Sequence, residues 1–578
     1  MRQGRRHVDV EQRPIWELQV VDLSNVDTIA RALDLDENVA RLLVQRGIRT
    51  IEEARRFLCP AADQLHDPFL LPDAEIAIDR LLVAVERGER IAIHGDYDVD
   101  GVTATVLLRR VLDLIGADVF HFIPHRLTDG YGLQVGGIDR LHQEGATVVV
   151  TVDCGIRSLG AAERARALNI DLIVTDHHEP GDVLPDALAV INPRRKDASY
   201  PFRDLSGAGI SFKLAQGICK RLNRSEWVPA LMKIAAIGTV ADVVCLQGEN
   251  RTIAKLGLDG LTAGRHTRGL EALLEVSKLA GKRITSEDVG FRLAPRLNAA
   301  GRLSSAELAA QLLLSTESSS VSTCAALAKE LDDLNMQRRE LERDGTKSVY
   351  ESLGELERPC YVVWSTDWHR GVIGIIASRL AERFRRPAIV IAVEGDDAYG
   401  SGRSIPGFDL LSALDGCSDL LVQYGGHRQA VGLRLSSGDI EAFRQHFEKY
   451  VGERLVAADC EPLLIVDAEI EFGSITQKFV RDVQRLEPFG KGNSRPLFTA
   501  SGVRVVDGPH LVKSEHLRMT LGQGGKRFQA IAWGAASELG RFGSKGARSL
   551  KVAFSVTENT FREKTTTQLT IADVKEDD

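Results

Sequence analysis

The sequence lacks the features that would place it among secreted, membrane-spanning or zinc-stabilised proteins. Its 578 residues include eight cysteines, and no two of them form a Cys-x-x-Cys pair, so neither structural zinc nor a redox couple is indicated. No apolar run approaches the roughly 20 residues that span a bilayer. The start MRQGRRHVDV has no apolar signal core. We therefore expect reduced cysteines, a cytoplasmic location and no membrane partner.

An excess of positive charge is also missing. The formal net charge of −8 does not by itself indicate a nucleic-acid-binding protein, but the clustering of charge matters more than its sum. Residues 501–550 hold eight Lys or Arg against three Asp or Glu. The C-terminal region is therefore a candidate surface for a polyanion.

The length and the alternation of patterns predict an α/β protein of several domains. From about residue 90, short apolar runs alternate with helical patterns, which is typical of a parallel sheet covered by helices. A charged helix should connect it to a smaller α/β unit, and short strands near the C-terminus predict a barrel of the oligonucleotide-binding (OB) type. The expected units are a helical segment 1–72, a catalytic α/β domain 73–317, a connecting helix 318–352, a second α/β domain 353–455 and an OB-like barrel 463–578.

Three apolar runs end in acid or histidine, namely RIAIHGDYD, TVVVTVD and DLIVTDHH. Ligands of parallel sheets gather just beyond the carboxyl ends of the strands, so these runs can deliver their polar residues to one rim. A helix ending in AAIGTVADVV adds one more acid. The residues expected at the rim are His94, Asp98, Asp100, Asp153, Asp176, His177, His178 and Asp242.

Imidazole and carboxylates without thiolates form a ligand set suited to Mn²⁺ or Mg²⁺. Two such ions can activate a water and stabilise both the attacking and the leaving oxygen of a phosphoryl group, so we expect phosphodiester hydrolysis with two divalent ions. For DYDVDG alone, a solvated turn or a Ca²⁺-like loop remains an alternative. A phosphotransferase of the haloacid-dehalogenase type is another, although its aspartate nucleophile has no need of the paired histidines in TDHH.

The motifs HGDYDVDG, VDCGI, TDHHEP and GTVADVV follow one another on successive βα units. In this order they resemble the DHH phosphoesterase superfamily. SGRS and GGHRQAVG resemble its companion DHHA1 domain, while LEPFGKGN and the barrel resemble the members that degrade single-stranded DNA. The resemblance implies a metal-dependent 5′-to-3′ exodeoxyribonuclease that is specific for single strands, releases 5′-mononucleotides and acts in DNA recombination and repair. By analogy it implies a single-strand-binding protein and a helicase as partners. We expect a monomer.

The resemblance also assigns roles to the rim residues. Asp100 and Asp153 would be shared between two metals, and both belong to the expected catalytic set together with His178, which would face the scissile phosphate. Asp96 and Asp176 would orient the ligands without touching a metal. The expected metal ligands are His94, Asp98, Asp100, Asp153, His177 and Asp242.

Basic or small polar residues near the motifs, together with residues of the basic barrel, are candidates for phosphate and strand contacts. A plain surface position is the alternative for any single arginine. Phe528 and Trp533 lie among cations, as in a stacking platform, or they face the barrel core, which we favour for Trp533. The candidates are Arg109, Arg302, Ser401, Arg403, His427, Lys513, Arg518, Lys526, Arg527 and Phe528.

Two other functions fit parts of the sequence. A phosphodiesterase for short oligonucleotides or cyclic dinucleotides would share the motifs, but such a small substrate needs no OB-like barrel. A catalytically silent DNA-binding scaffold would keep the fold and lose a ligand, whereas all six expected ligands are present.

Overall fold

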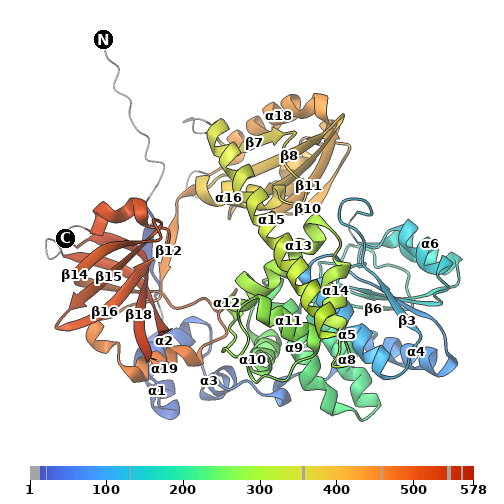
Figure 1. The fold of residues 1–578 in the computed structure, drawn as a ribbon, viewed down its shortest axis with the longest axis horizontal. Coiled ribbons are helices and arrows are strands. Elements are labelled where there is room, and N and C mark those ends of the chain that lie inside the picture. The colour runs from blue at the N-terminus through green and yellow to red at the C-terminus, as the bar shows by residue number, and fades with distance from the viewer. Residues whose placement is uncertain are drawn as a thin grey trace.

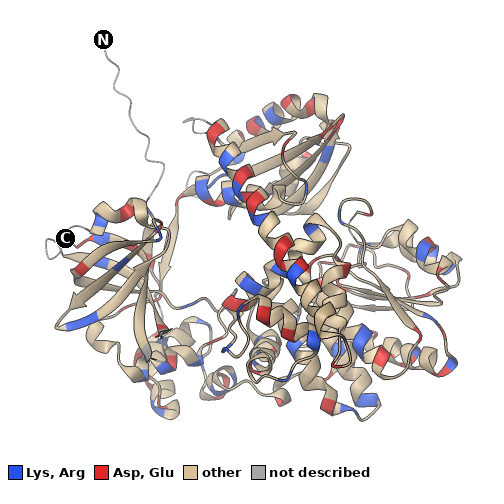
Figure 2. Cartoon of the chain, viewed as in Figure 1, with Lys and Arg blue, Asp and Glu red and all other residues tan. Residues whose placement is uncertain are grey.

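The computed structural model describes residues 13–20, 22–130, 132–353, 358–456, 460–542, 549–561 and 564–577. They form two α/β lobes joined by a long helix, and a β-barrel lobe beside them (Figure 1). Basic and acidic residues are interspersed over all three lobes in the view of Figure 2. No helix within the described ranges has the length and apolar character needed to cross a membrane. All eight cysteines carry free thiols.

The first lobe is built on a five-stranded sheet with the order β3-β2-β4-β5-β6. All four pairings in it are parallel, as the alternating sequence pattern predicted. The residues of β2 and β4 are buried throughout, because helices cover both faces of the sheet. The strands are β2 (Ile91–His94), β3 (Val119–Phe122), β4 (Val148–Val152), β5 (Asp171–Thr175) and β6 (Ala189–Ile191).

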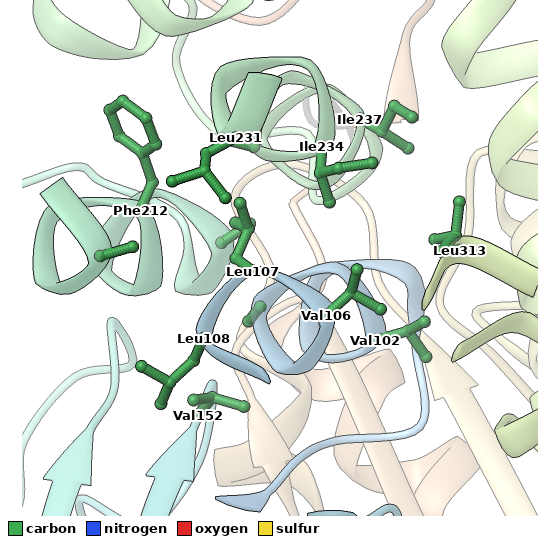
Figure 3. Packing of buried hydrophobic residues seen from close by; sticks show 14 of the residues in the cluster. Val102, Val106, Leu107, Leu108, Val152, Phe212, Leu231, Ile234, Ile237 and Leu313 are labelled. Atoms are coloured by element: carbon green, nitrogen blue, oxygen red, sulfur yellow. The ribbon is translucent and has the colours of Figure 1, made fainter. Parts of the chain in front are cut away.

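Helix α5 (Val99–Leu114) is the centre of the larger core, and twelve of its sixteen residues are buried. Val106 and Leu107 lie among side chains of the neighbouring helices, and Leu108 lies near Val152 of the sheet (Figure 3). A helix that is apolar on all sides belongs in the interior, and this packing fixes the acid-rich turn at its N-terminus. The other helices of the lobe are α4 (Ala74–Arg87), α6 (Val135–Gln143), α7 (Leu159–Ala167), α8 (Gly207–Arg221), α9 (Val228–Ala241), α10 (Gly248–Thr262), α11 (Arg268–Val276), α12 (Ser286–Asp288), the π-helix η5 (Val289–Leu293), α13 (Ala294–Leu303) and α14 (Glu307–Leu314).

Helix α15 (Val321–Leu353) connects the first lobe to the second. The second sheet has the order β10-β11-β9-β8-β7 and is mixed, because only β7 and β8 pair in parallel. The elements of this lobe are β7 (Tyr361–Ser365), α16 (Ile373–Phe384), β8 (Ala388–Glu394), β9 (Asp397–Arg403), α17 (Leu410–Asp415), β10 (Gln423–His427), β11 (Ala430–Ser436) and α18 (Ile440–Arg454). The domain boundaries proposed from the sequence stay predictions.

The C-terminal strands close into the expected barrel, because β14 pairs with β15 on one side and with β17 on the other. The short strand β13 extends the sheet beside β14. The elements are β12 (Leu463–Val466), β13 (Ala468–Glu469), α19 (Gln477–Arg485), β14 (Phe498–Val512), β15 (His516–Gln523), β16 (Lys526–Ala532), β17 (Leu550–Phe561) and β18 (Lys564–Glu576).

Residues 26–58 pack against this C-terminal barrel, whereas Leu65, Phe69 and Leu71 pack against the lobe that follows in the chain. Val39 and Leu42 share a core with Phe479 and Phe498 of the barrel lobe, and β1 pairs in parallel with β12. The two ends of the chain therefore form one folded unit. The N-terminal elements are β1 (Ile15–Leu18), α1 (Val26–Leu33), α2 (Glu37–Gln45) and α3 (Ile51–Leu58).

A buried arginine joins this unit to the first lobe. Arg251 of α10 is 2% exposed, and its guanidinium donates to the carbonyl oxygens of Phe57 (2.8 Å) and Glu487 (2.9 Å). The same group lies 3.6 Å from the centre of the Phe57 ring. One side chain thus ties together three segments that are far apart in the sequence.

Candidate metal centre and interdomain cleft

The acid-rich turn after β2 is held by two helix N-termini. Asp98 caps α5, and its Oδ1 accepts a hydrogen bond from the Gly101 amide (3.0 Å). Asp100 lies in the first turn, where its carboxylate accepts from the amides of Gly207 (2.7 Å) and Ala208 (2.9 Å) at the start of α8. Helix N-termini favour negative charge, so both carboxylates are fixed in position.

Asp153 directly follows β4 and occupies a strained position. Its φ angle is +63°, a left-handed conformation that costs a residue with a Cβ atom about 1–3 kcal/mol. A Cβ atom on Gly207 would lie 2.3 Å from Oδ1 of Asp153, so only glycine leaves room for this carboxylate. The left-handed backbone of Asp153 directs its carboxylate toward α8, and the missing side chain of Gly207 leaves room for it there. Asp153 therefore lies at the centre of the rim.

His177, two residues beyond β5, faces three carboxylates. Its Nε2 atom is 3.1 Å from Oδ1 of Asp153, 3.7 Å from Oδ2 of Asp242 and 3.9 Å from Oδ2 of Asp100. Asp242 follows the end of α9. Four elements that are separate in the sequence therefore bring their polar side chains to one point.

Three groups of side chains have ligand atoms within 4.8 Å of one another. Asp153 belongs to two of the groups, and His177 also belongs to two. The groups are Asp96, Asp98 and Asp153; Asp100, His177 and Asp242; and Asp153, His177 and His178. Two neighbouring sets of donors linked through Asp153 and His177 are an arrangement that can hold a pair of divalent ions.

The electrostatics of the rim are unfavourable without cations. Burial, followed by repulsion from neighbouring aspartates, raises the pKa of Asp100 to about 7, of Asp96 to about 8 and of Asp242 to about 9. The same causes raise the pKa of Asp153 well above its usual value. Burial lowers the pKa of His177 to about 3, which keeps its imidazole neutral.

An unpartnered buried oxygen supports the fit to metal ions. Oδ1 of Asp153 has no hydrogen-bond partner among the described residues, although the Nε2 atom of His177 is 3.1 Å away. A bound cation reverses the pKa shifts of clustered carboxylates and satisfies such an oxygen. Oxygen donors with neutral imidazole therefore fit Mn²⁺ or Mg²⁺ at this rim.

His178 is oriented by Asp176. Its Nδ1 atom lies 2.7 Å from Oδ1 of Asp176, whose other oxygen accepts from the amide of Ile156 (2.9 Å). Burial, the largest single cause, lowers the pKa of His178, but the hydrogen bond and charge of Asp176 together with the charges of Asp242 and Asp96 raise that pKa to about 9. The ring of His427 from the second lobe stacks 6.4 Å from the His178 ring. The two α/β lobes therefore face each other across this histidine pair.

The structure brings Asp96, and not His94, to the donor groups. His94 is 1% exposed, its Nδ1 atom lies 3.6 Å from Sγ of Cys154, and a Cβ atom on Gly137 of α6 would be 3.5 Å from its Nε2. The ring thus lies between the rim and α6, outside the three groups. A metal-binding role for His94 stays a prediction, whereas Asp96 has a position suited to a ligand.

Arginines line the cleft beside the rim. Arg302 of α13 donates to the carbonyl oxygen of Gly371 (3.1 Å), and Arg403 of β9 donates to Oγ of Ser401 (3.2 Å). Burial, followed by Arg126 and other neighbouring arginines, lowers the pKa of Arg302 to about 9. Burial and Arg126 also lower the pKa of Arg403. These cations repel one another, so a multiply charged anion between them would be favoured.

Sequence reasoning missed Arg126, which follows β3 at the same edge of the sheet and lies 4.8 Å from the centre of the Tyr97 ring. Arg126 could have been predicted, because ligand-binding residues gather just beyond the carboxyl ends of parallel strands. Arg109 is not brought to the cleft: its Nε atom lies 2.9 Å from both carboxylate oxygens of Asp113, and another guanidinium nitrogen lies 3.3 Å from Nδ1 of His121. A phosphate contact by Arg109 stays a prediction that this position does not favour.

The barrel presents cations and one exposed aromatic ring. Lys513, Arg518, Lys526 and Arg527 are all exposed. The expectation that Trp533 lies in the core is wrong, because its side chain is 61% exposed and meets the ring of His516 edge-on at 4.8 Å. Trp533 follows the last residue of β16, where the alternation of inward and outward positions no longer applies.

Phe528 takes the opposite position from the one predicted for a stacking residue. It packs against the barrel core with its ring 5.5 Å from that of Phe472. The arrangement favours Trp533 over Phe528 as the base-stacking residue of the barrel.

Comparisons with known proteins agree with this geometry. Three family models match the chain: the DHH family N-terminal domain at residues 90–239, the DHHA1 domain at 357–453 and the RecJ OB domain at 466–573. The chain is 38% identical over 514 residues to the single-stranded-DNA-specific exonuclease RecJ of Bacillus subtilis, covering 88% of this chain but 64% of that protein. It is 34% identical to the RecJ of Salmonella typhimurium, covering 95% of this chain and 97% of the relative.

Solved structures give the same result. The crystal structure of RecJ in complex with Mn²⁺ from Thermus thermophilus matches with a TM-score of 0.82 at 29% identity, over 97% of this chain and 79% of that one. The Mg²⁺ complex of RecJ from the same organism matches with a TM-score of 0.76 at 28% identity, over 97% of this chain and 78% of that one.

Proposed function

Because the chain belongs to the RecJ family of single-stranded-DNA-specific exonucleases, we propose that it hydrolyses single-stranded DNA from the 5′ end and releases 5′-mononucleotides. The observation that carries this proposal is a pair of neighbouring donor sets, in which Asp153 of one set lies 3.1 Å from His177 of the other, beside a group of arginines. The two sets of ligands would hold the ions that hydrolyse a phosphodiester. The arginines provide for recognition of a strand end.

The residues that would hold the ions are the two sets at the rim. Asp96, Asp98 and Asp153 would form one site, and Asp100, His177 and Asp242 the other. When bound, a pair of Mn²⁺ or Mg²⁺ ions activates a water and stabilises charge on the phosphoryl oxygens. The amides of Gly207 and Ala208 hold Asp100 in place throughout, so this carboxylate needs no reorganisation when a substrate arrives.

His178 would act on the phosphate from beside Asp153 and His177, with which it shares a donor group. Its contact with Asp176 keeps the ring charged near neutral pH, so it donates to a phosphoryl oxygen and stabilises the negative charge that develops there. His427 reaches the same place from the second lobe. The second lobe therefore contributes to the same site.

The cleft arginines account for attack at an end of the strand. A terminal phosphate carries about −1.5 to −2 charges, more than the single charge of an internal phosphodiester. Burial and the neighbouring Arg126 lower the pKa of Arg302 and of Arg403, and Ser401 adds a hydroxyl beside Arg403. Such a group binds a 5′-phosphate more strongly than an internal one, which sets the first residue of the strand over the metals.

The barrel would gather the rest of the strand through Trp533 and its exposed cations. The same proposal includes a role in DNA recombination and repair and a cytoplasmic location. It also includes action as a monomer, with a single-strand-binding protein and a helicase as partners. The eight free thiols agree with a reducing compartment.

The test is product analysis on a denaturing gel with Mn²⁺, comparing 5′-labelled and 3′-labelled single strands with a blunt duplex. We expect immediate release of a labelled mononucleotide from the 5′ end of the single strand, a preference for a 5′-phosphate over a 5′-hydroxyl, and a spared duplex. Cleavage confined to oligonucleotides of a few residues would instead make the protein a small-substrate phosphodiesterase.

A further inference from the structure

Two cavities meet beside the metal centre. The first, of about 550 Å³, extends from the end of α9 next to Asp242 past Arg302 to the segment 489–495. The second, of about 1000 Å³, runs along α15 between that helix and η5, and reaches Arg379 of α16. Phe291, Pro295 and Arg338 line both cavities. The second cavity, called the α15 groove below, therefore adjoins the first across these three side chains.

An exposed aromatic ring stands at the junction. Phe291 is 81% exposed, whereas Val289 and Leu293 of the same short helix are fully buried. This segment is a π-helix, a rare form that is frequently found at functional sites. A Cβ atom on the adjacent Gly290 would meet nothing within 4 Å, so the space around the junction is open. The buried anchors hold the segment while Phe291 projects into the passage.

The α15 groove is basic. Its lining includes eight Lys or Arg and two Glu, and Figure 2 shows basic positions along α15 with acidic ones between them. Arg338 and Arg379 share Glu342, with contacts of 2.7 and 3.1 Å. Lys278 and Arg339 form no ion pair with any residue that the structure describes. Arg292, Arg296 and Arg343 pair with Asp288, Asp332 and Glu340 outside the lining, and Lys347 pairs with Glu351. Among the described residues, the positive charge without a carboxylate partner therefore lies on Lys278 and Arg339.

We propose that the α15 groove binds the backbone of the single strand beyond the scissile bond, with Phe291 stacking on a base where the strand turns out of the catalytic cleft. This inference rests on the proposed exonuclease function. A groove for an acidic protein segment would need the same cations, but it would need neither the passage to the metal centre nor a ring standing in that passage. Cations along a helix beside an aromatic ring are the means by which single strands are held without sequence preference.

The test compares a long single strand with a 5′-phosphorylated trinucleotide that is too short to reach the groove. The variants are Phe291→Ala and the double variant Lys278→Ala with Arg339→Ala. We expect each to raise KM for the long strand about tenfold more than KM for the trinucleotide. The slope of log affinity against log salt should become shallower by about 0.7 for each cation that contacts a phosphate.

Two control variants separate this effect from changes in folding or overall charge. Phe291→Tyr keeps the ring and should retain the wild-type ratio of the two KM values. Lys329→Ala removes a cation from α15 outside the groove, where its side chain is 78% exposed, and should leave both KM values unchanged. Equal effects of Phe291→Ala on both substrates, or no effect on either, would overturn the inference.

Direct binding keeps this inference separate from the proposed function. Fluorescence anisotropy of a labelled oligo-dT strand in EDTA measures binding to the groove without any cleavage. If the wild type cleaved neither substrate, that result would refute the proposed exonuclease activity but not the binding of a strand in the groove. The double variant should bind oligo-dT about tenfold more weakly. Unchanged oligo-dT binding with loss of binding to a labelled oligo-glutamate peptide would overturn the inference and assign the groove to an acidic protein segment.

Discussion

A buried aspartate in a left-handed backbone conformation links the two donor sets. Asp153 belongs to one set, lies 3.1 Å from His177 of the other and is 2% exposed, at a φ angle of +63°. Asp153→Ala removes the shared carboxylate, so we expect hydrolysis to fall below detection while the affinity for single strands is retained. Gel-based turnover and anisotropy with oligo-dT measure the two quantities. Turnover at a wild-type rate would remove Asp153 from the site.

Gly207 faces this carboxylate at a position where no side chain fits. A Cβ atom on Gly207 would lie 2.3 Å from Oδ1 of Asp153, so Gly207→Ala must displace the aspartate or the start of α8. Displacements of about 1 Å in an active site cost on the order of 100-fold in rate, and we expect such a fall in kcat/KM. Gly136→Ala in α6 is the matched control, because a Cβ atom there meets nothing within 4 Å. Similar rates in the two variants would contradict this account of Gly207.

At the level of single residues, the sequence predicts where side chains start but not where they point. The rule on strand ends located Asp153 and His177, because the end of each strand fixes the edge of the sheet. It did not show that the ring of His94 turns toward Cys154, or that Asp96 takes a place beside Asp98. Those directions depend on packing against α6 and on the conformation of the acid-rich turn after β2. Both result from contacts among many residues and cannot be predicted from one position.

Among the elements, α10 carries the joint between the first lobe and the barrel lobe. Arg251→Met would leave the carbonyl oxygens of Phe57 and Glu487 without their donor in a buried place. We expect the free energy of unfolding to fall by about 3 kcal/mol, with faster amide exchange in α3 and in residues 486–493. Lys255→Ala on the same helix is the control, since among the described residues Lys255 pairs only with Asp259 at the surface. Unchanged exchange at both segments would show that Arg251 does not hold the joint.

Patterns of whole elements were predicted better than their ends. The parallel sheet, the connecting helix and the barrel follow from apolar periodicity, which reports burial over many residues. The stacking role predicted for Phe528 rested on the neighbouring cations and not on periodicity, and its ring packs inward within the regular pairing of β15 with β16. Trp533 lies beyond the end of β16, where the strand period no longer assigns a face.

For the molecule as a whole, the union of the two chain ends changes how the barrel can be tested. Deleting residues 463–578 would expose Val39 and Leu42, which share the barrel core. The sequence contains no sign of this contact between segments more than 400 residues apart, because each segment is an ordinary amphipathic pattern by itself. Charge reversal in the full-length chain is therefore a sharper test than truncation.

Lys526→Glu with Arg527→Glu reverses two exposed charges of the barrel without touching its core. We expect weaker capture of long strands, a salt dependence that is shallower by about 0.7 for each phosphate that is no longer bound, and little change in cleavage of a trinucleotide. Rates on both substrates at several salt concentrations give the comparison. A matched loss on the trinucleotide would mean that these cations act at the metal centre rather than on the extended strand.

The most direct test of the central claim is the stoichiometry of Mn²⁺ binding to the wild type and to Asp153→Asn, measured by calorimetry and by the electron paramagnetic resonance of free Mn²⁺. Asparagine tolerates the left-handed conformation and removes only the charge, so the fold should be kept. The account predicts two ions for the wild type and weaker binding of both in the variant, because Asp153 links the two donor sets. Two ions bound with equal affinity by both proteins would contradict it.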